Sequence, residues 1–140
     1  MTALGERQRF SRAAHAAPES VPVLRYAVVA YARSGGVTAG VLDDVAIAVS
    51  EAVTNAVVHA YADRATAGTV TVKACLSHDE LAISISDGGD GMRPRPDSPG
   101  LGLGLPLMAQ LADRMELGQI DGVGTQVRLF FDLMRRQIHE

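Results

Sequence analysis

The chain has 140 residues, a length that fits one domain, residues 1–140. Hydrophobic residues make up 47% and charged residues 21%, and this composition excludes a disordered chain. The formal net charge is −3 and there is one cysteine, which argues against a broad nucleic-acid footprint, a disulfide framework and a multi-cysteine zinc site. No apolar run approaches the roughly 18 residues that span a bilayer, and the N-terminus lacks the apolar region of a signal peptide. We therefore expect a cytoplasmic protein without a membrane or direct nucleic-acid partner.

The first two predicted elements are a strand and a helix. Weak alternation of apolar and polar residues predicts a strand over 7–14. The segment APES at 17–20 predicts a helix start, with Glu19 or Ser20 near the cap. Apolar residues then recur at helical spacing until the glycine pair at 35–36, which is expected to end the helix.

The second predicted helix begins after Thr38, a candidate cap, and runs to about Ala62. It is apolar nearly all round, which indicates burial. Yet Glu51, Asn55 and His59 stand at i, i+4 and i+8 and so share one stripe. A carboxylate, an amide and an imidazole can serve as a base, a metal ligand and a hydrogen-bonding partner. The alternative is a stripe that simply faces water, although such a stripe usually carries lysine or arginine.

Two β-hairpins complete the sheet. The first alternates over 69–76 and 81–86, and the second over 115–120 and 125–133. Residues 133–140 are expected to be a frayed tail. Hairpins imply antiparallel pairing, so the expected fold is an α/β (α+β) two-layer sandwich. Its sheet is mixed but largely antiparallel, and helices cover one face.

A glycine-rich segment, DGGDG at 87–91, directly follows a buried strand. Gly89 and Gly91 allow the backbone to approach a ligand closely. Asp87, at the end of the strand, is an acceptor for an exocyclic amine such as that of adenine. The alternatives are a calcium loop or an ordinary turn, but the segment lacks the spaced acids of an EF-hand.

A second glycine cluster, GLGLGL at 100–105, opens a short helix. Free N–H groups and the positive dipole end at such a helix start suit a phosphate. The cluster matches neither a P-loop nor a dinucleotide-binding fingerprint. Gly124 and Thr125 open the last strand, where the hydroxyl can reach a phosphate or where the pair is only a turn.

These motifs occur in the order of a known superfamily. They are Glu51-x3-Asn55-x3-His59, Asp87-x-Gly89-x-Gly91, Gly102-x-Gly104-Leu105 and Gly124-Thr125. The order resembles the Bergerat-fold (GHKL, histidine-kinase-like) ATPases over roughly residues 20–131. Within that superfamily, the short chain and the segment SEAVTNAVVHAY look most like the bacterial anti-sigma factor serine/threonine-protein kinases.

The resemblance implies ATP and Mg²⁺ as ligands and assigns roles to residues. Glu51 would be the general base, Asn55 would hold Mg²⁺, and Asp87 would bind the adenine amino group. The residues expected at the ATP site are Asn55, His59, Asp87, Gly89, Gly91, Met92, Gly102, Leu103, Gly104 and Thr125. The implied activity is phosphorylation of a serine on a STAS-type anti-sigma factor antagonist, together with sequestration of a sigma factor by a homodimer.

The segment before the second glycine cluster departs from the family pattern. In the family it forms the lid over ATP, with a basic residue just before the glycines, whereas this chain has Gly100 there and a short, proline-rich lid. Arg93 and Arg95 are the candidates to supply positive charge near the γ-phosphate. The alternative function is therefore a nucleotide-dependent binding switch of the same fold with little or no kinase activity. A histidine kinase or a gyrase-type ATPase would need further segments that 140 residues do not hold.

Overall fold

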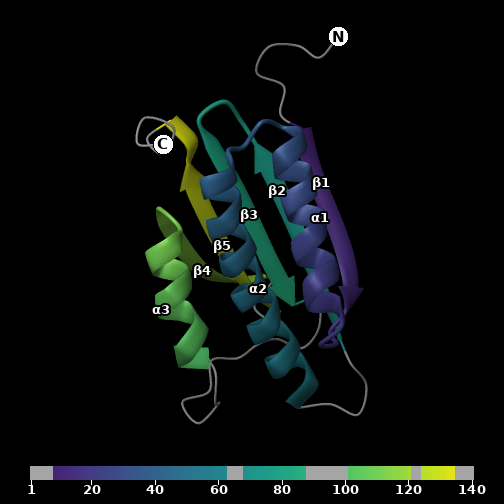
Figure 1. Cartoon of the computed structure of the whole chain (residues 1–140). Coiled ribbons are helices and arrows are strands. Elements are labelled where there is room, and N and C mark those ends of the chain that lie inside the picture. The colour runs from purple at the N-terminus through teal and green to yellow at the C-terminus, as the bar shows by residue number, and fades with distance from the viewer. Residues whose placement is uncertain (1–7, 63–67, 88–100, 121–123, 135–140) are drawn as a thin grey trace.

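The structure is a computed structural model that describes residues 8–62, 68–87, 101–120 and 124–134. Eight elements follow one another in the predicted order of strand, two helices, hairpin, helix and hairpin (Figure 1). In chain order they are β1 (Gln8–His15), α1 (Ser20–Ser34), α2 (Ala39–Ala62), β2 (Thr69–Leu76), β3 (Glu80–Asp87), α3 (Leu101–Leu111), β4 (Arg114–Ile120) and β5 (Gly124–Asp132).

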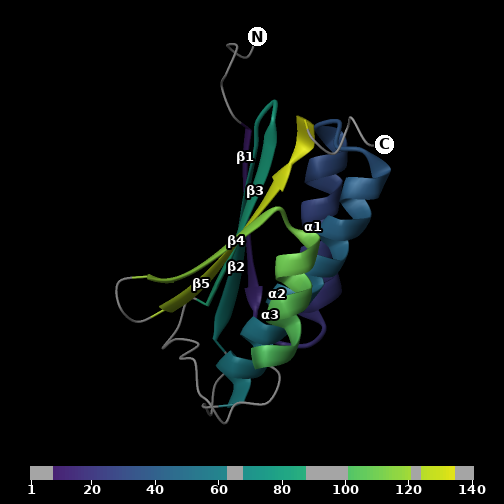
Figure 2. The ribbon, with the colours of Figure 1, turned by 90° about the vertical axis from the view of Figure 1, so that its left-hand side faces the viewer.

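The five strands form one sheet in the order β1-β2-β3-β5-β4. All four pairings are antiparallel. The prediction of a largely antiparallel sheet is therefore confirmed. Within the described ranges no two strands pair in parallel, so this part of the sheet is not mixed. Figure 2 shows that α1, α2 and α3 lie on one face of the sheet and that none of them lies on the other. The predicted two-layer sandwich is therefore confirmed.

The core lies between the helices and this covered face. The sheet contributes alternate residues because successive side chains of a strand point to opposite faces. From β3 these are Leu81, Ile83 and Ile85, each at most 1% exposed. Both long helices pack apolar side chains at helical spacing against the sheet, including Leu24 and Val28 of α1 and Val45, Val49 and Val53 of α2. No helix in the described part of the chain is long and apolar enough to cross a membrane.

The helix ends agree with the sequence except in the cap of α2. Gly36 has φ +94°, which lets the chain turn out of α1 after Ser34 as predicted. Glu19 occupies the N-cap position of α1 without a side-chain hydrogen bond. Capping by the Thr38 hydroxyl is wrong, because that oxygen is buried and finds no hydrogen-bond partner among the described residues. Its backbone carbonyl instead accepts the N–H of Leu42 at 2.9 Å.

The predicted frayed tail begins too early. Leu133 is 5% exposed, and its N–H donates to the carbonyl of Asp79 at 2.9 Å. Burial of the leucine and this bond to the β2–β3 turn hold the residue in place. Residues 135–140 of the predicted tail lie outside the described residues.

The Tyr31 hydroxyl ties α1 to the sheet and gives a first prediction. It accepts the backbone N–H of Leu76 at 2.9 Å, and burial raises the pKa of its phenol. We expect Tyr31→Phe to lower the free energy of unfolding by about 1–3 kcal/mol, because a partly buried N–H loses its acceptor. Tyr26→Phe is the matched control, since Tyr26 is 73% exposed and should change stability little. Urea unfolding with an unchanged slope measures both variants, and equal stability of the two would contradict the prediction.

Candidate nucleotide site

Three chain segments converge at one end of the molecule. They are the C-terminal half of α2, the end of β3 and the start of α3 (Figure 1). α2 contacts both β3 and α3, so it forms the centre of this group. The motifs recognised in the sequence at Glu51–Asn55, Asp87 and Gly102–Gly104 thus reach one region from segments far apart in the chain.

The polar stripe of α2 is more than a solvated helix face. Asn55 is only 8% exposed, and its Nδ2 is buried without a hydrogen-bond partner among the described residues. Glu51, one turn earlier, is half-buried. Leaving a buried amide group unsatisfied costs about 1–3 kcal/mol, which a bound ligand can recover. The alternative of a stripe facing water is therefore wrong for Asn55. His59 lies in the last turns of α2, and its side chain is outside the described part.

Asp87 is the last residue of β3 and one of the most buried polar residues described, at 1% exposure. Its backbone is held in register opposite Val70 of β2. Taking a carboxylate out of water is costly, so a carboxylate at this depth at a strand end is a candidate for specific recognition rather than for surface solubility.

Thr125 lies on the neighbouring strand close to Asp87. The last paired residues of β3 and β5 are Ser86 and Gln126, and one further step along this antiparallel register brings Asp87 opposite Thr125. Thr125 is half-buried. The predicted glycine–threonine pair at the start of β5 therefore belongs to the same end of the sheet as the buried aspartate.

The glycines at 102 and 104 are already helical, because α3 begins at Leu101. The N–H groups of the first four residues of a helix have no intrahelical acceptor, and here they belong to residues 101–104. Met108 of α3 and Ala112, the residue after it ends, are buried and anchor the helix to the core. The N-terminus of α3 is thereby fixed at the end of the molecule where Asp87 lies, with its positive dipole end available for an anion.

Several predicted site residues fall outside the described residues. They are Gly89, Gly91, Met92, Arg93 and Arg95. Leu103 belongs to the first turn of α3, but its side chain is likewise not described.

One neighbour of the stripe was not predicted. Arg25 of α1 donates from Nη1 to the Ser50 hydroxyl at 3.3 Å, directly beside Glu51 in the chain. The two residues are 25 positions apart on separate helices, and nothing in the local sequence pattern connects them.

Comparisons with known proteins identify the family and related sequences. Residues 14–131 match the family described as the histidine kinase-like ATPase domain. The chain is 34% identical over 120 residues to an anti-sigma F factor of Clostridium acetobutylicum, covering 78% of this chain and 82% of that protein. It is 34% identical over 136 residues to the serine-protein kinase RsbW of Bacillus licheniformis, covering 86% of this chain and 84% of that protein.

A solved structure shares the fold. It contains the RsbU and RsbW domains of Rv1364c from Mycobacterium tuberculosis and superposes with a TM-score of 0.70 at 24% identity. The match covers 90% of this chain but 32% of the larger one. The family match over 14–131, together with relatives 34% identical over most of their length, shows that the chain belongs to the histidine kinase-like ATPase domain family.

Proposed function

We propose that the chain is an ATP-dependent protein-serine/threonine kinase that phosphorylates a serine of a STAS-type anti-sigma factor antagonist and also sequesters a sigma factor. The observation that carries the proposal is the convergence of three elements: α2 with its buried Asn55, the end of β3 with its buried Asp87, and the N-terminus of α3. Relatives named serine-protein kinase and anti-sigma F factor support it. We further propose that the protein acts as a homodimer, which sedimentation at several concentrations tests.

Each end of ATP has a matching group in this arrangement. The Asp87 carboxylate accepts the adenine amino group, and the N–H groups at the start of α3 bind phosphate oxygens. Thr125, which the β3–β5 register brings beside Asp87, supplies a hydroxyl to the adenine end. Gly89, Gly91 and Met92 complete the pocket wall in this proposal, and His59 borders it from α2.

Mg²⁺ fits the chemistry at Asn55. An amide oxygen is a ligand that this ion accepts, and Mg²⁺ commonly takes one or two protein ligands together with substrate phosphates. The atom of the buried Asn55 amide that has no partner in the described structure is Nδ2, which can donate to an oxygen of the ligand, whereas Mg²⁺ would take Oδ1. When bound, Mg²⁺ neutralises charge on the β- and γ-phosphates.

Glu51 is the general base in this proposal. Its carboxylate accepts the proton of the partner's serine hydroxyl as that oxygen attacks the γ-phosphorus, while the bond from the γ-phosphorus to the β–γ bridging oxygen breaks and ADP leaves. Glu51 is half-buried, and no hydrogen bond or ion pair to its side chain is present among the described residues, so its oxygens remain able to accept a proton.

Calorimetry with ATP and Mg²⁺ tests the nucleotide site, and transfer of labelled phosphate to a STAS-type protein encoded beside this chain tests the kinase. No heat of ATP binding by the folded protein would refute both steps. ATP binding without transfer to any such partner would favour the second candidate, a nucleotide-dependent binding switch. Gly100, in place of a basic residue before the glycine cluster, is the observation that favours this candidate.

The lid arginines distinguish the kinase from the switch. We expect Arg93→Ala combined with Arg95→Ala to slow single-turnover transfer by about 10²–10³-fold, because they would supply charge at the γ-phosphate. The affinity for ADP, which lacks that phosphate, should change much less. Equal small losses in transfer and in ADP affinity would remove both arginines from the chemical step.

A further inference from the structure

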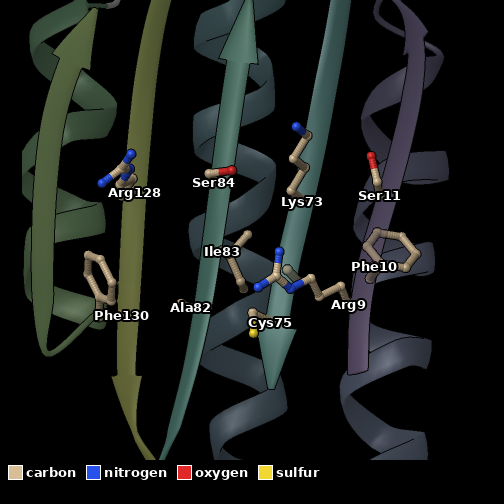
Figure 3. A pocket seen from close by; sticks show the side chains of 11 residues that line it. Arg9, Phe10, Ser11, Lys73, Cys75, Ala82, Ile83, Ser84, Arg128 and Phe130 are labelled. Atoms are coloured by element: carbon tan, nitrogen blue, oxygen red, sulfur yellow. The ribbon is translucent and has the colours of Figure 1, made fainter. Parts of the chain in front are cut away.

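The face of the sheet that the helices leave open carries a hollow. Figure 3 shows it from that side, with the helices behind the strands. Its volume is about 800 Å³, which is large enough for several side chains of a partner. The residues on which the argument depends are Arg9, Lys73, Cys75, Ala82, Ser84 and Arg128.

Strand register explains the shape of the hollow. Cys75 of β2 pairs with Ala82 of β3, and in the next outward-facing row Ser84 lies between Lys73 and Arg128. The small side chains of Cys75, Ala82 and Ser84 on β2 and β3 therefore form the floor of the hollow, and the long basic side chains stand around it. In Figure 3 the Arg9 side chain extends from β1 across β2 toward this floor.

The charged residues that line the hollow are all positive, although the chain as a whole has a net charge of −3. Three of its lining residues are basic, and no carboxylate is among those described. Arg128 Nη1 lies 3.9 Å from Glu116 Oε1, and because both side chains are about half exposed, the guanidinium keeps N–H donors for a further carboxylate. The guanidinium carbon of Arg114 lies 3.9 Å from the centre of the Phe130 ring. Arg9 and Lys73 have no ion pair within the described ranges, so all three cations of the hollow can face an anionic partner.

We propose that this hollow docks an acidic helix of a partner protein. Lys73 and Arg128 stand in one cross-strand row two strand intervals apart, which is about 10 Å. Carboxylates two turns apart on a helix are separated by roughly 10.5 Å along its axis, so a helix crossing the strands can present one to each cation. Cys75 and Ala82 leave room for its apolar side chains between them.

A second copy of this chain is a poorer occupant. If two copies packed hollow against hollow, Arg9, Lys73 and Arg128 of one copy would face the same three cations of the other. Like charges placed opposite one another oppose association. The docking surface lies on the opposite side of the sheet from α2 and α3, which carry the nucleotide groups. The proposal therefore does not depend on the kinase assignment.

The experiment titrates a labelled, alanine-rich helical peptide, with glutamates two turns apart and leucines beside them, into the full chain. A peptide with lysine in place of each glutamate is its counterpart. We expect the acidic peptide to bind at low salt, and Lys73→Glu to weaken it at least about tenfold, with Lys73→Gln weakening it less. Arg33→Glu, an exposed cation on the helix side of the molecule, is the matched control and should leave binding unchanged.

Cys75 is the one cysteine of the chain and reports occupancy of the floor. The acidic peptide should slow its alkylation by a maleimide in the native protein and not in Lys73→Glu. Equal binding of the two peptides, or of Lys73→Glu and the native chain, overturns the proposal. Protection of Cys75 that rises with protein concentration without peptide also overturns it, because the face would then pair with a second copy. Unchanged ATP affinity in Lys73→Glu keeps this result separate from the nucleotide site.

Discussion

We expect the Asp87→Asn variant to lose roughly 10- to 100-fold in affinity for ATP while keeping its fold. Hydrogen bonds to charged groups contribute about 1.5–3 kcal/mol, and asparagine has the same shape but lacks the charge. Its amide can also turn N–H groups toward the adenine amine, which then meets a donor. Because Asp87 is 1% exposed, no water reaches the position readily to replace the lost acceptor. Calorimetry with ATP and Mg²⁺ measures the change.

Asp79→Asn is the matched control for this variant. Asp79 is an exposed aspartate in the turn at the other end of the β2–β3 hairpin, where it accepts the Ser77 hydroxyl at 3.1 Å. The same chemical change there should leave ATP affinity as it is. If Asp87→Asn binds ATP as tightly as Asp79→Asn does, the buried aspartate does not bind the adenine amino group.

The second large effect is expected at Glu51. Glu51→Gln should retain ATP affinity and slow phosphate transfer by about 10²–10⁴-fold, the usual contribution of a general base. Glutamine is nearly isosteric with glutamate but cannot accept the serine proton, so the loss falls on the chemical step and not on ground-state binding. Single-turnover transfer from labelled ATP to the partner serine, measured beside ATP affinity, separates the two quantities.

Glu19→Gln provides the corresponding control, because Glu19 is exposed and makes no side-chain cap bond to α1. A Glu51→Gln enzyme that transfers phosphate at the native rate would exclude Glu51 as the base. A variant that loses ATP affinity and transfer to the same degree would instead assign Glu51 to nucleotide binding.

Local patterns in the sequence were sufficient to predict the helices and strands and many residues of the candidate site. Alternation over β2 and β3 predicted which residues face the core, because a strand with one buried face must alternate. Helical spacing put Glu51 and Asn55 on one stripe, and the position of Asp87 at the end of a buried strand marked it as a candidate. Each of these features depends on residues close together in the chain.

Features that depend on distant residues were not predictable in this way. Insertion of β5 between β3 and β4 depends on non-local pairing, and the contact of Arg25 with Ser50 joins two helices. The orientation of the Thr38 hydroxyl and the burial of Leu133 depend on what tertiary packing places around them. The basic hollow exists only once cross-strand rows bring Arg9, Lys73 and Arg128 to one face.

The place of β5 in the sheet has a consequence for synthesis of the protein. Among the described strands, β4 pairs with β5 alone, and β5 also closes the free edge of β3. A nascent chain that has emerged only as far as β4 can therefore form a three-stranded sheet of β1, β2 and β3, while β4 has no strand to join. Thr125, which the β3–β5 register brings beside Asp87, lies on β5, so this end of the sheet is complete only after that strand arrives. Assembly of the proposed nucleotide site therefore ends with β5, and chains stalled before this strand would lack Thr125 there.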